Sequence, residues 1–184
     1  MSTAPTRADK PLILGLGNPI LTDDRVGLEV ARQLHAELGA ERAALEEASV
    51  GGIELLHVLE GWRRVVLIDS YIDPIDPTAL PPGEIRELGL DELETTSMAL
   101  SPHTAGLTHC LEFGRACGLV MPEVVRVFVI GVGDPYTFGE RCTPVVQAAI
   151  PKAVALIAER VFGPDGWGAD RNSAANFPGS QGID

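Results

Sequence analysis

Three runs of apolar residues stand out along the chain, at Leu12–Leu14, Val65–Ile68 and Val124–Ile130. Each run is continuous apart from Arg126 in the last, and such runs are typical of strands buried on both faces of a parallel sheet. Two weaker runs, Ala43–Glu47 and Glu84–Leu88, predict a further strand and a short edge strand. The pattern therefore predicts a largely parallel sheet.

The segments between these strands have helical spacing. Apolar residues recur every four positions from Val26 to Leu38, and Gly39 offers a stop for that helix. A short helical stretch follows around Leu55–Leu59. Because Ser101-Pro102 combines an N-cap residue with a proline in the first turn, we expect a helix from there to about Cys117.

The same cap-and-proline pattern, at Thr143-Pro144, predicts a last helix with Pro151 as a kink. Its expected buried stripe consists of Val146, Ile150, Ala153, Val154, Ile157 and Val161. Strands that alternate with helices in this way predict an α/β fold. We expect a three-layer α/β/α sandwich with a twisted, largely parallel sheet.

The organisation along the chain predicts one domain. Residues 1–10 are polar and are expected to form a flexible leader, residues 11–162 the α/β domain, and residues 163–184 a disordered tail. Asp73–Gly83 contains four prolines and is expected to be a surface loop. A chain of 184 residues can bury one sizeable core and is short for two.

The composition narrows the class of partner. The formal net charge of −12 would repel a phosphate backbone, so nucleic acid is not expected as a partner. The three cysteines lack zinc-knuckle spacing and are expected to be small reduced core residues of a cytoplasmic protein. No apolar run approaches the roughly 20 residues that span a bilayer, so no membrane association is expected. We expect a monomer.

The segment Gly15–Asp24 follows the first strand and places a glycine turn before two acids. A glycine turn at this position first suggests a dinucleotide site, but the Gly-x-Gly-x-x-Gly pattern fails because Ile20 stands where the third glycine is needed. Glu46 or Glu47 at the end of the second strand resembles a ribose-binding acid. Dinucleotide binding therefore remains a weaker alternative.

A second constellation is more specific. Asp24 follows the first strand, Asp69 ends the third, and His103 is expected in the first turn of a helix. All three would lie at the sheet edge where loops converge. Two carboxylates and an imidazole suit a borderline divalent metal, and a bound cation would remove the repulsion between the carboxylates.

Simpler explanations exist for each residue taken singly. Asp23 fits the N-cap of the first long helix, where Asp24 would favour the helix dipole. Asp69 fits a turn residue at a strand end, and His103 fits a polar side chain with ordinary partners. Neighbouring residues on an extended segment point in opposite directions, so we do not expect both Asp23 and Asp24 to be ligands.

The chain resembles the nickel-iron hydrogenase maturation endopeptidases. The matching segments keep the family's order and approximate spacing; they are Leu14–Asp24, Val66–Asp69, Leu100–Leu107, Ile130–Val132 and Thr143-Pro144. The resemblance implies an enzyme that removes a short carboxyl-terminal extension from the hydrogenase large-subunit precursor after nickel insertion. It also implies that the metal ligands are Asp24, Asp69 and His103.

The same resemblance implies that the precursor carries the nickel, which serves as the recognition mark, although another divalent metal could occupy the site. The family assigns no classical peptidase nucleophile, which agrees with the absence of a Ser-His or Cys-His motif here. We therefore expect the metal to polarise the scissile carbonyl or activate a water, with Asp23 as a weaker candidate base. Ala48-Ser49 depart from the glycines that many relatives have there.

One alternative from another class stays open. A non-catalytic metal-sensing module that binds the nickel-loaded subunit would present the same ligands as a protease. The sequence alone does not separate the two.

Overall fold

The computed structural model describes residues 10–73, 76, 80–95, 104, 106–164 and 166–167. Within them a single five-stranded sheet runs in the order β2-β1-β3-β5-β4. The strands are β1 (Leu12–Leu16), β2 (Ala44–Ala48), β3 (Arg64–Tyr71), β4 (Ile85–Leu88) and β5 (Val124–Gly131). All neighbours pair in parallel except β4, which runs antiparallel to β5 at the edge. The predicted strands and the edge position of Glu84–Leu88 are confirmed.

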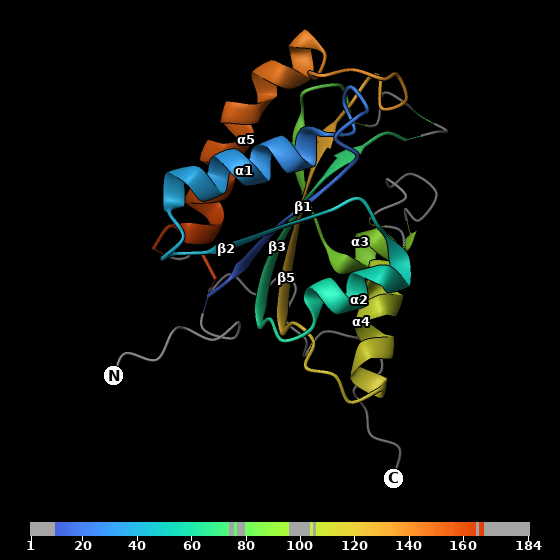
Figure 1. Ribbon diagram of the computed structural model, residues 1–184, viewed down its shortest axis with the longest axis vertical. Coiled ribbons are helices and arrows are strands. Elements are labelled where there is room, and N and C mark those ends of the chain that lie inside the picture. The colour runs from blue at the N-terminus through green and yellow to red at the C-terminus, as the bar shows by residue number, and fades with distance from the viewer. Residues whose placement is uncertain are drawn as a thin grey trace.

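Helices cover both faces of this sheet (Figure 1). The helices are α1 (Val26–Leu38), a 3-10 turn η1 (Gly52–Glu54), α2 (Leu55–Leu59), α3 (Leu90–Thr95), α4 (Leu107–Ala116) and α5 (Pro144–Phe162). One face carries α1 and α5, and the other carries α2, α3 and α4. The three-layer α/β/α prediction is confirmed.

Alternate residues of each central strand pack into two separate hydrophobic cores, one on each face of the sheet. In β1, Leu12 and Leu14 pack on the side of α2 and α4, whereas Ile13 packs on the side of α1 and α5. In β3, Leu67 and Ile68 divide in the same way. Because both faces are covered, both sets of positions must be apolar, which explains the continuous apolar runs.

The predicted apolar stripes of the two long helices are also observed. Val26, Val30 and Leu34 of α1 are fully buried, and Leu38 packs partly against the same core. All six stripe positions of α5 are buried. None of the helices in the described ranges combines the length and apolar character that crossing a bilayer requires.

The start of α4 differs from the prediction. Helix α4 begins at Leu107, later than the Ser101 start predicted for it, because Gly106 has φ 79°, a left-handed conformation that interrupts a helix. Ser101, Pro102 and His103 lie outside the described residues.

The start of the segment predicted as a disordered tail packs on the domain. The Arg126 Nη1 donates to the carbonyl of Gly166 at 2.7 Å, and the Trp167 ring lies edge-on to Phe162. Residues 168–184 and 1–9 lie outside the described part of the chain.

Candidate active site

Asp24 and Asp69 both lie at the carboxyl ends of the two central strands. The chain leaves β1 through α1 toward β2 on one side, whereas β3 pairs with β5 on the other side. The β1 and β3 ends therefore form the topological switch point, where open α/β sheets bind their ligands. Asp24 lies in the loop between β1 and α1, just before the N-cap Arg25, and Asp69 lies near the end of β3.

Asp24 is 6% exposed, and its carboxylate accepts hydrogen bonds from two described neighbours. The backbone amide of Asn18 donates to Oδ2 at 2.8 Å, and the Ser70 hydroxyl donates to Oδ1 at 2.8 Å. The first hydrogen bond links two residues of the loop after β1, and the second links this loop to β3. The carboxylate is therefore held between two segments that are far apart in the sequence.

Asp69 is fully buried and lies on the opposite face of β3 from Ser70. The Ser70 backbone amide donates to its Oδ1 at 2.8 Å, and the Thr104 hydroxyl donates to its Oδ2 at 3.1 Å. Asp69 thus contacts the segment that leads into α4. The sequence had suggested a simple turn residue as one explanation, but this side chain links two elements.

A chain of hydrogen bonds joins the two predicted acidic ligands through Ser70. His103, the third predicted ligand, directly precedes Thr104 in the sequence and lies outside the described residues. The described part of the chain holds no group of three His, Cys, Asp or Glu side chains placed to bind a metal together. Two of the three predicted metal ligands, Asp24 and Asp69, therefore belong to one hydrogen-bond network.

Asp23 has contacts of another kind. Its fully buried carboxylate accepts hydrogen bonds from the amides of Gly133 and Asp134 and from both the amide and the hydroxyl of Thr143. The N-cap position of α1 is Arg25, and it makes no side-chain cap bond. The prediction that Asp23 caps α1 is wrong, because its side chain reaches the loop between β5 and α5 instead.

That loop is further fixed to the turn after β1. Leu21 and Phe138 form an isolated antiparallel bridge, and the Thr22 amide donates to the carbonyl of Thr137 at 2.8 Å. Hydrogen bonds from the amide and side chain of Thr137 hold the pKa of Asp134 below its usual value. The loops after β1 and β5 therefore form one connected rim beside Asp24.

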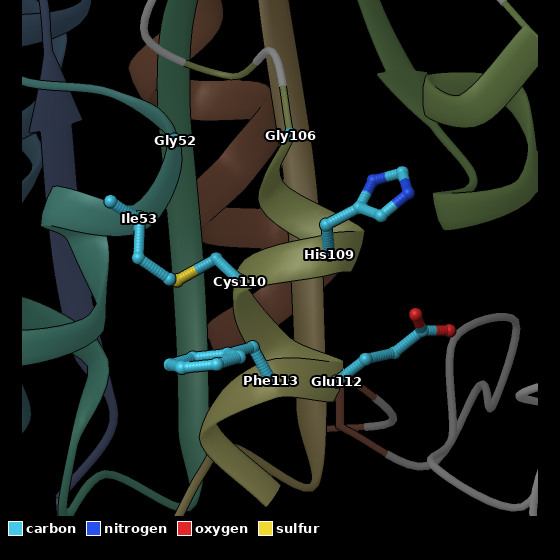
Figure 2. A pocket seen from close by; sticks show the side chains of 7 residues that line it. All are labelled: Gly52, Ile53, Gly106, His109, Cys110, Glu112 and Phe113. Atoms are coloured by element: carbon cyan, nitrogen blue, oxygen red, sulfur yellow. The ribbon is translucent and has the colours of Figure 1, made fainter. Parts of the chain in front are cut away.

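A shallow groove of about 470 Å³ lies between η1 and the start of α4. Figure 2 shows Cys110 and Phe113 extending from α4 toward Ile53, whereas His109 and Glu112 extend from the other side of the helix. Ile53 and Phe113 are 56% and 54% exposed. His109 and Glu112 are both exposed and belong to a solvated face of α4.

Comparison with known proteins identifies the family of this chain. The family model described as HycI, hydrogenase maturation protease, matches residues 28–160. The chain belongs to the hydrogenase maturation protease family. The resemblance found in the motifs is thereby confirmed, and the protein is a protease.

Individual relatives of this protease carry the same description. The hydrogenase 2 maturation protease of Escherichia coli is 26% identical over 145 residues, which cover 78% of this chain and 85% of that protein. The solved structure of the hydrogenase maturating endopeptidase HybD from E. coli has a TM-score of 0.67 at 22% identity, covering 83% of this chain and 92% of that one.

The [NiFe] hydrogenase maturation protease HybD from Thermococcus kodakarensis has a TM-score of 0.63 at 23% identity, with coverages of 82% and 97%. These structures share the fold of the protease described here.

The glycine turn of the protease has a packing explanation that does not involve a dinucleotide. A methyl group at Gly17, where φ is 142°, would overlap the carbonyl oxygen of Asp24. A methyl group at Gly15 would lie 2.8 Å from the Cβ of Ala31 on α1. Both glycines therefore allow close approach of the protein's own chain, and the dinucleotide alternative loses its motivation.

The cysteines of the protease are free thiols, and they differ in burial. Cys110 and Cys142 are buried as predicted, but Cys117 is exposed because it follows the last turn of α4 at the surface. Burial, reinforced by the charge of Asp23, raises the pKa of the Cys142 thiol to about 11. A thiol with such a pKa is a poor nucleophile at neutral pH.

Sequence reasoning missed the two hydroxyl residues that contact the acids. Ser70 directly follows Asp69, and Thr104 directly follows His103, so their positions next to predicted ligands were the available signal. No pattern of spacing indicates which neighbour of a ligand turns toward it, since this depends on strand pairing and on loop packing.

Proposed function

We propose that this protease removes a carboxyl-terminal extension from the large-subunit precursor of a nickel-iron hydrogenase after nickel has been inserted. Asp24, Asp69 and His103 bind the nickel that the precursor carries. The observation that supports the proposal most is that Asp24 and Asp69, both buried, belong to one hydrogen-bond network at the switch point. Membership of the family supports the substrate class.

The donor chemistry of these residues fits the proposal. Two carboxylates supply oxygen ligands and an imidazole supplies nitrogen, a mixed set that suits a borderline divalent cation. Two carboxylates held in one network repel each other, and a cation between them relieves that repulsion. Another divalent metal would bind to the same set.

The residues of the protease bind and orient in this proposal. Asp24 and Asp69 hold the nickel centre of the precursor, so the chain next to that centre lies at the switch point. The metal supplies Lewis-acid chemistry, polarising the scissile carbonyl or activating a water. The four hydrogen bonds to the buried Asp23 favour a structural role for it, and we propose no catalytic step for this residue.

Single substitutions test the ligand assignment. Loss of a residue that hydrogen-bonds a metal ligand typically lowers metal affinity or activity by roughly 10–100-fold. Loss of a ligand itself should lower processing of the nickel-loaded precursor by more than this, and the variants that test it are Asp24→Asn, Asp69→Asn and His103→Ala. Glu112→Gln, an exposed acid on α4, is the matched control and should process normally. Circular dichroism shows whether each variant is folded. Full processing by folded His103→Ala would remove that residue from the site.

A further inference from the structure

The residue between the two acids has an unusual position in the site. Ser70 is 2% exposed and follows Asp69 on β3, so its side chain points to the opposite face of the sheet. Its hydroxyl donates to Asp24 Oδ1, and its backbone amide donates to Asp69 Oδ1, both at 2.8 Å. One residue therefore contacts both acids and fixes their relative placement.

Thr104 connects Asp69 to the segment that precedes α4. It is 1% exposed, and its hydroxyl donates to Asp69 Oδ2 at 3.1 Å. Its carbonyl accepts from the amide of Leu107, the first residue of α4, at 3.1 Å. Thr104 thus ties the segment before α4 to the end of β3.

We infer that Ser70 and Thr104 are positioning residues that orient the two carboxylates for the nickel of the precursor. The inference rests on the proposed function. The network runs from the turn after β1, through Asp24, Ser70 and Asp69, to Thr104. It therefore connects the three chain segments from which the proposed ligands come.

The chemistry of the hydroxyl group suits this task. A hydroxyl donates one hydrogen bond to a carboxylate and carries no charge, so it fixes the orientation of the acid without cancelling the negative charge that attracts a cation. Hydrogen bonds from neutral donors to a charged acceptor are stronger than those between neutral groups. Removing an outer partner of a metal ligand typically costs 10–100-fold in metal affinity.

Calorimetric titration of the full-length protein with Ni²⁺ alone tests the inference without using activity. Ser70→Ala and Thr104→Val should each weaken Ni²⁺ binding by about 10–100-fold relative to the unmodified protein. Thr104→Ser keeps the hydroxyl and should restore most of the affinity that Thr104→Val loses. The isosteric valine and the smaller serine together separate the hydrogen bond from the volume of the side chain.

Ser49→Ala is the matched control. The Ser49 hydroxyl donates to the carbonyl of Gly17 at 2.8 Å, so this variant removes a serine hydrogen bond to the same turn without altering the network of the acids. Ser49→Ala should bind Ni²⁺ like the unmodified protein. Thermal melts of all variants show whether a loss of affinity accompanies a loss of folding.

The outcomes separate this inference from the proposed function. If Asp24→Asn loses Ni²⁺ affinity while Ser70→Ala and Thr104→Val keep it, the positioning role is overturned and the ligand assignment stands. If Thr104→Ser binds as weakly as Thr104→Val, the hydroxyl is not responsible and the inference fails. If the unmodified protein and Asp24→Asn bind Ni²⁺ equally, the ligand assignment fails and the inference fails with it.

Discussion

Asp23 and Asp24 are neighbours in the chain, but their side chains contact different parts of the molecule. Asp24 contacts the turn after β1 and the end of β3, whereas Asp23 contacts the loop between β5 and the start of α5. The pair therefore joins β1, β3 and β5 at the edge of the sheet where the proposed site lies. The two carboxylates contact different segments because the side chains of Asp23 and Asp24 point in different directions.

Asp23→Asn should destabilise the fold by about 3 kcal/mol, because hydrogen bonds to a buried charged group are among the stronger ones and an amide NH₂ would face the donors of Thr143 and the loop. Urea unfolding followed by circular dichroism measures the free energy of unfolding. The exposed control Glu112→Gln should change it by less than about 0.5 kcal/mol. Equal stability of Asp23→Asn and the unmodified protein would contradict the structural role of Asp23.

The buried thiol of Cys142 should resist alkylation. Because its pKa is raised to about 11, only about a thousandth of the thiol is ionised at pH 8, and this fraction rises as the pH approaches 11. Iodoacetamide labelling followed by peptide mass spectrometry should modify exposed Cys117 first. Labelling of Cys142 at the rate of Cys117 in folded protein at pH 8 would show that the thiol is more accessible than the structure places it.

At the scale of elements, α1 packs unusually close to the sheet. A methyl group at Gly27 would overlap the carbonyl oxygens of Leu16 in β1 and Ile68 in β3. Gly15 and Ala31 make a similar close contact nearby. The small residues thus bring the start of α1, with the loop carrying Asp24, against the ends of both central strands.

Gly27→Ala should therefore lower stability by about 2 kcal/mol or more, since overpacking forces the helix away from the strands. This sign is opposite to the usual effect, because alanine in a helix interior is normally favoured over glycine by about 0.5–1 kcal/mol. Thermal unfolding compared with Glu37→Ala, an exposed position on the same helix, provides the measurement. A stabilised Gly27→Ala protein would show that α1 does not approach the strands this closely.

Arg126 connects β5, the edge strand and the end of α5. Its Nε donates to Glu87 at 2.7 Å, and its Nη1 donates to the carbonyls of Arg160 and Gly166. Arg126→Met should cost about 3 kcal/mol, because it leaves these acceptors without the buried donor. Arg63→Met removes an exposed pair with Glu123 and should have a far smaller effect on urea unfolding. Equal losses in the free energy of unfolding would contradict the role of Arg126 as a buried donor that links β5, β4 and the end of α5.

At the scale of the whole molecule, the sheet followed from the sequence because each central strand contains a run of apolar residues, interrupted only by Arg126 in β5. Covered faces leave no room for polar alternation, so runs such as Val65–Ile68 and Val124–Ile130 identified the buried strands directly. The sequence also placed Asp24 and Asp69 at one edge, because parallel strands end on the same side. These predictions needed only local pattern and the geometry of parallel sheets.

Other features depended on contacts between distant segments. The role of Asp23 follows from hydrogen bonds to Gly133, Asp134 and Thr143, more than a hundred residues away, which no local pattern indicates. The start of α4 depends on the left-handed Gly106, and a cap-and-proline pattern at Ser101 suggested an earlier start. The packing of Trp167 depends on Phe162 and Arg64, so composition alone suggested disorder there.

The intact mass of a nickel-loaded hydrogenase large-subunit precursor tests most directly whether the protein carries out the proposed cleavage. After incubation with the protease, the nickel-loaded precursor should lose the mass of one short carboxyl-terminal peptide, and the nickel-free precursor should keep its full mass. The Asp24→Asn protein should leave both precursors intact. Formation of a stable complex with the nickel-loaded precursor, with no loss of mass across cognate precursors, would contradict the account.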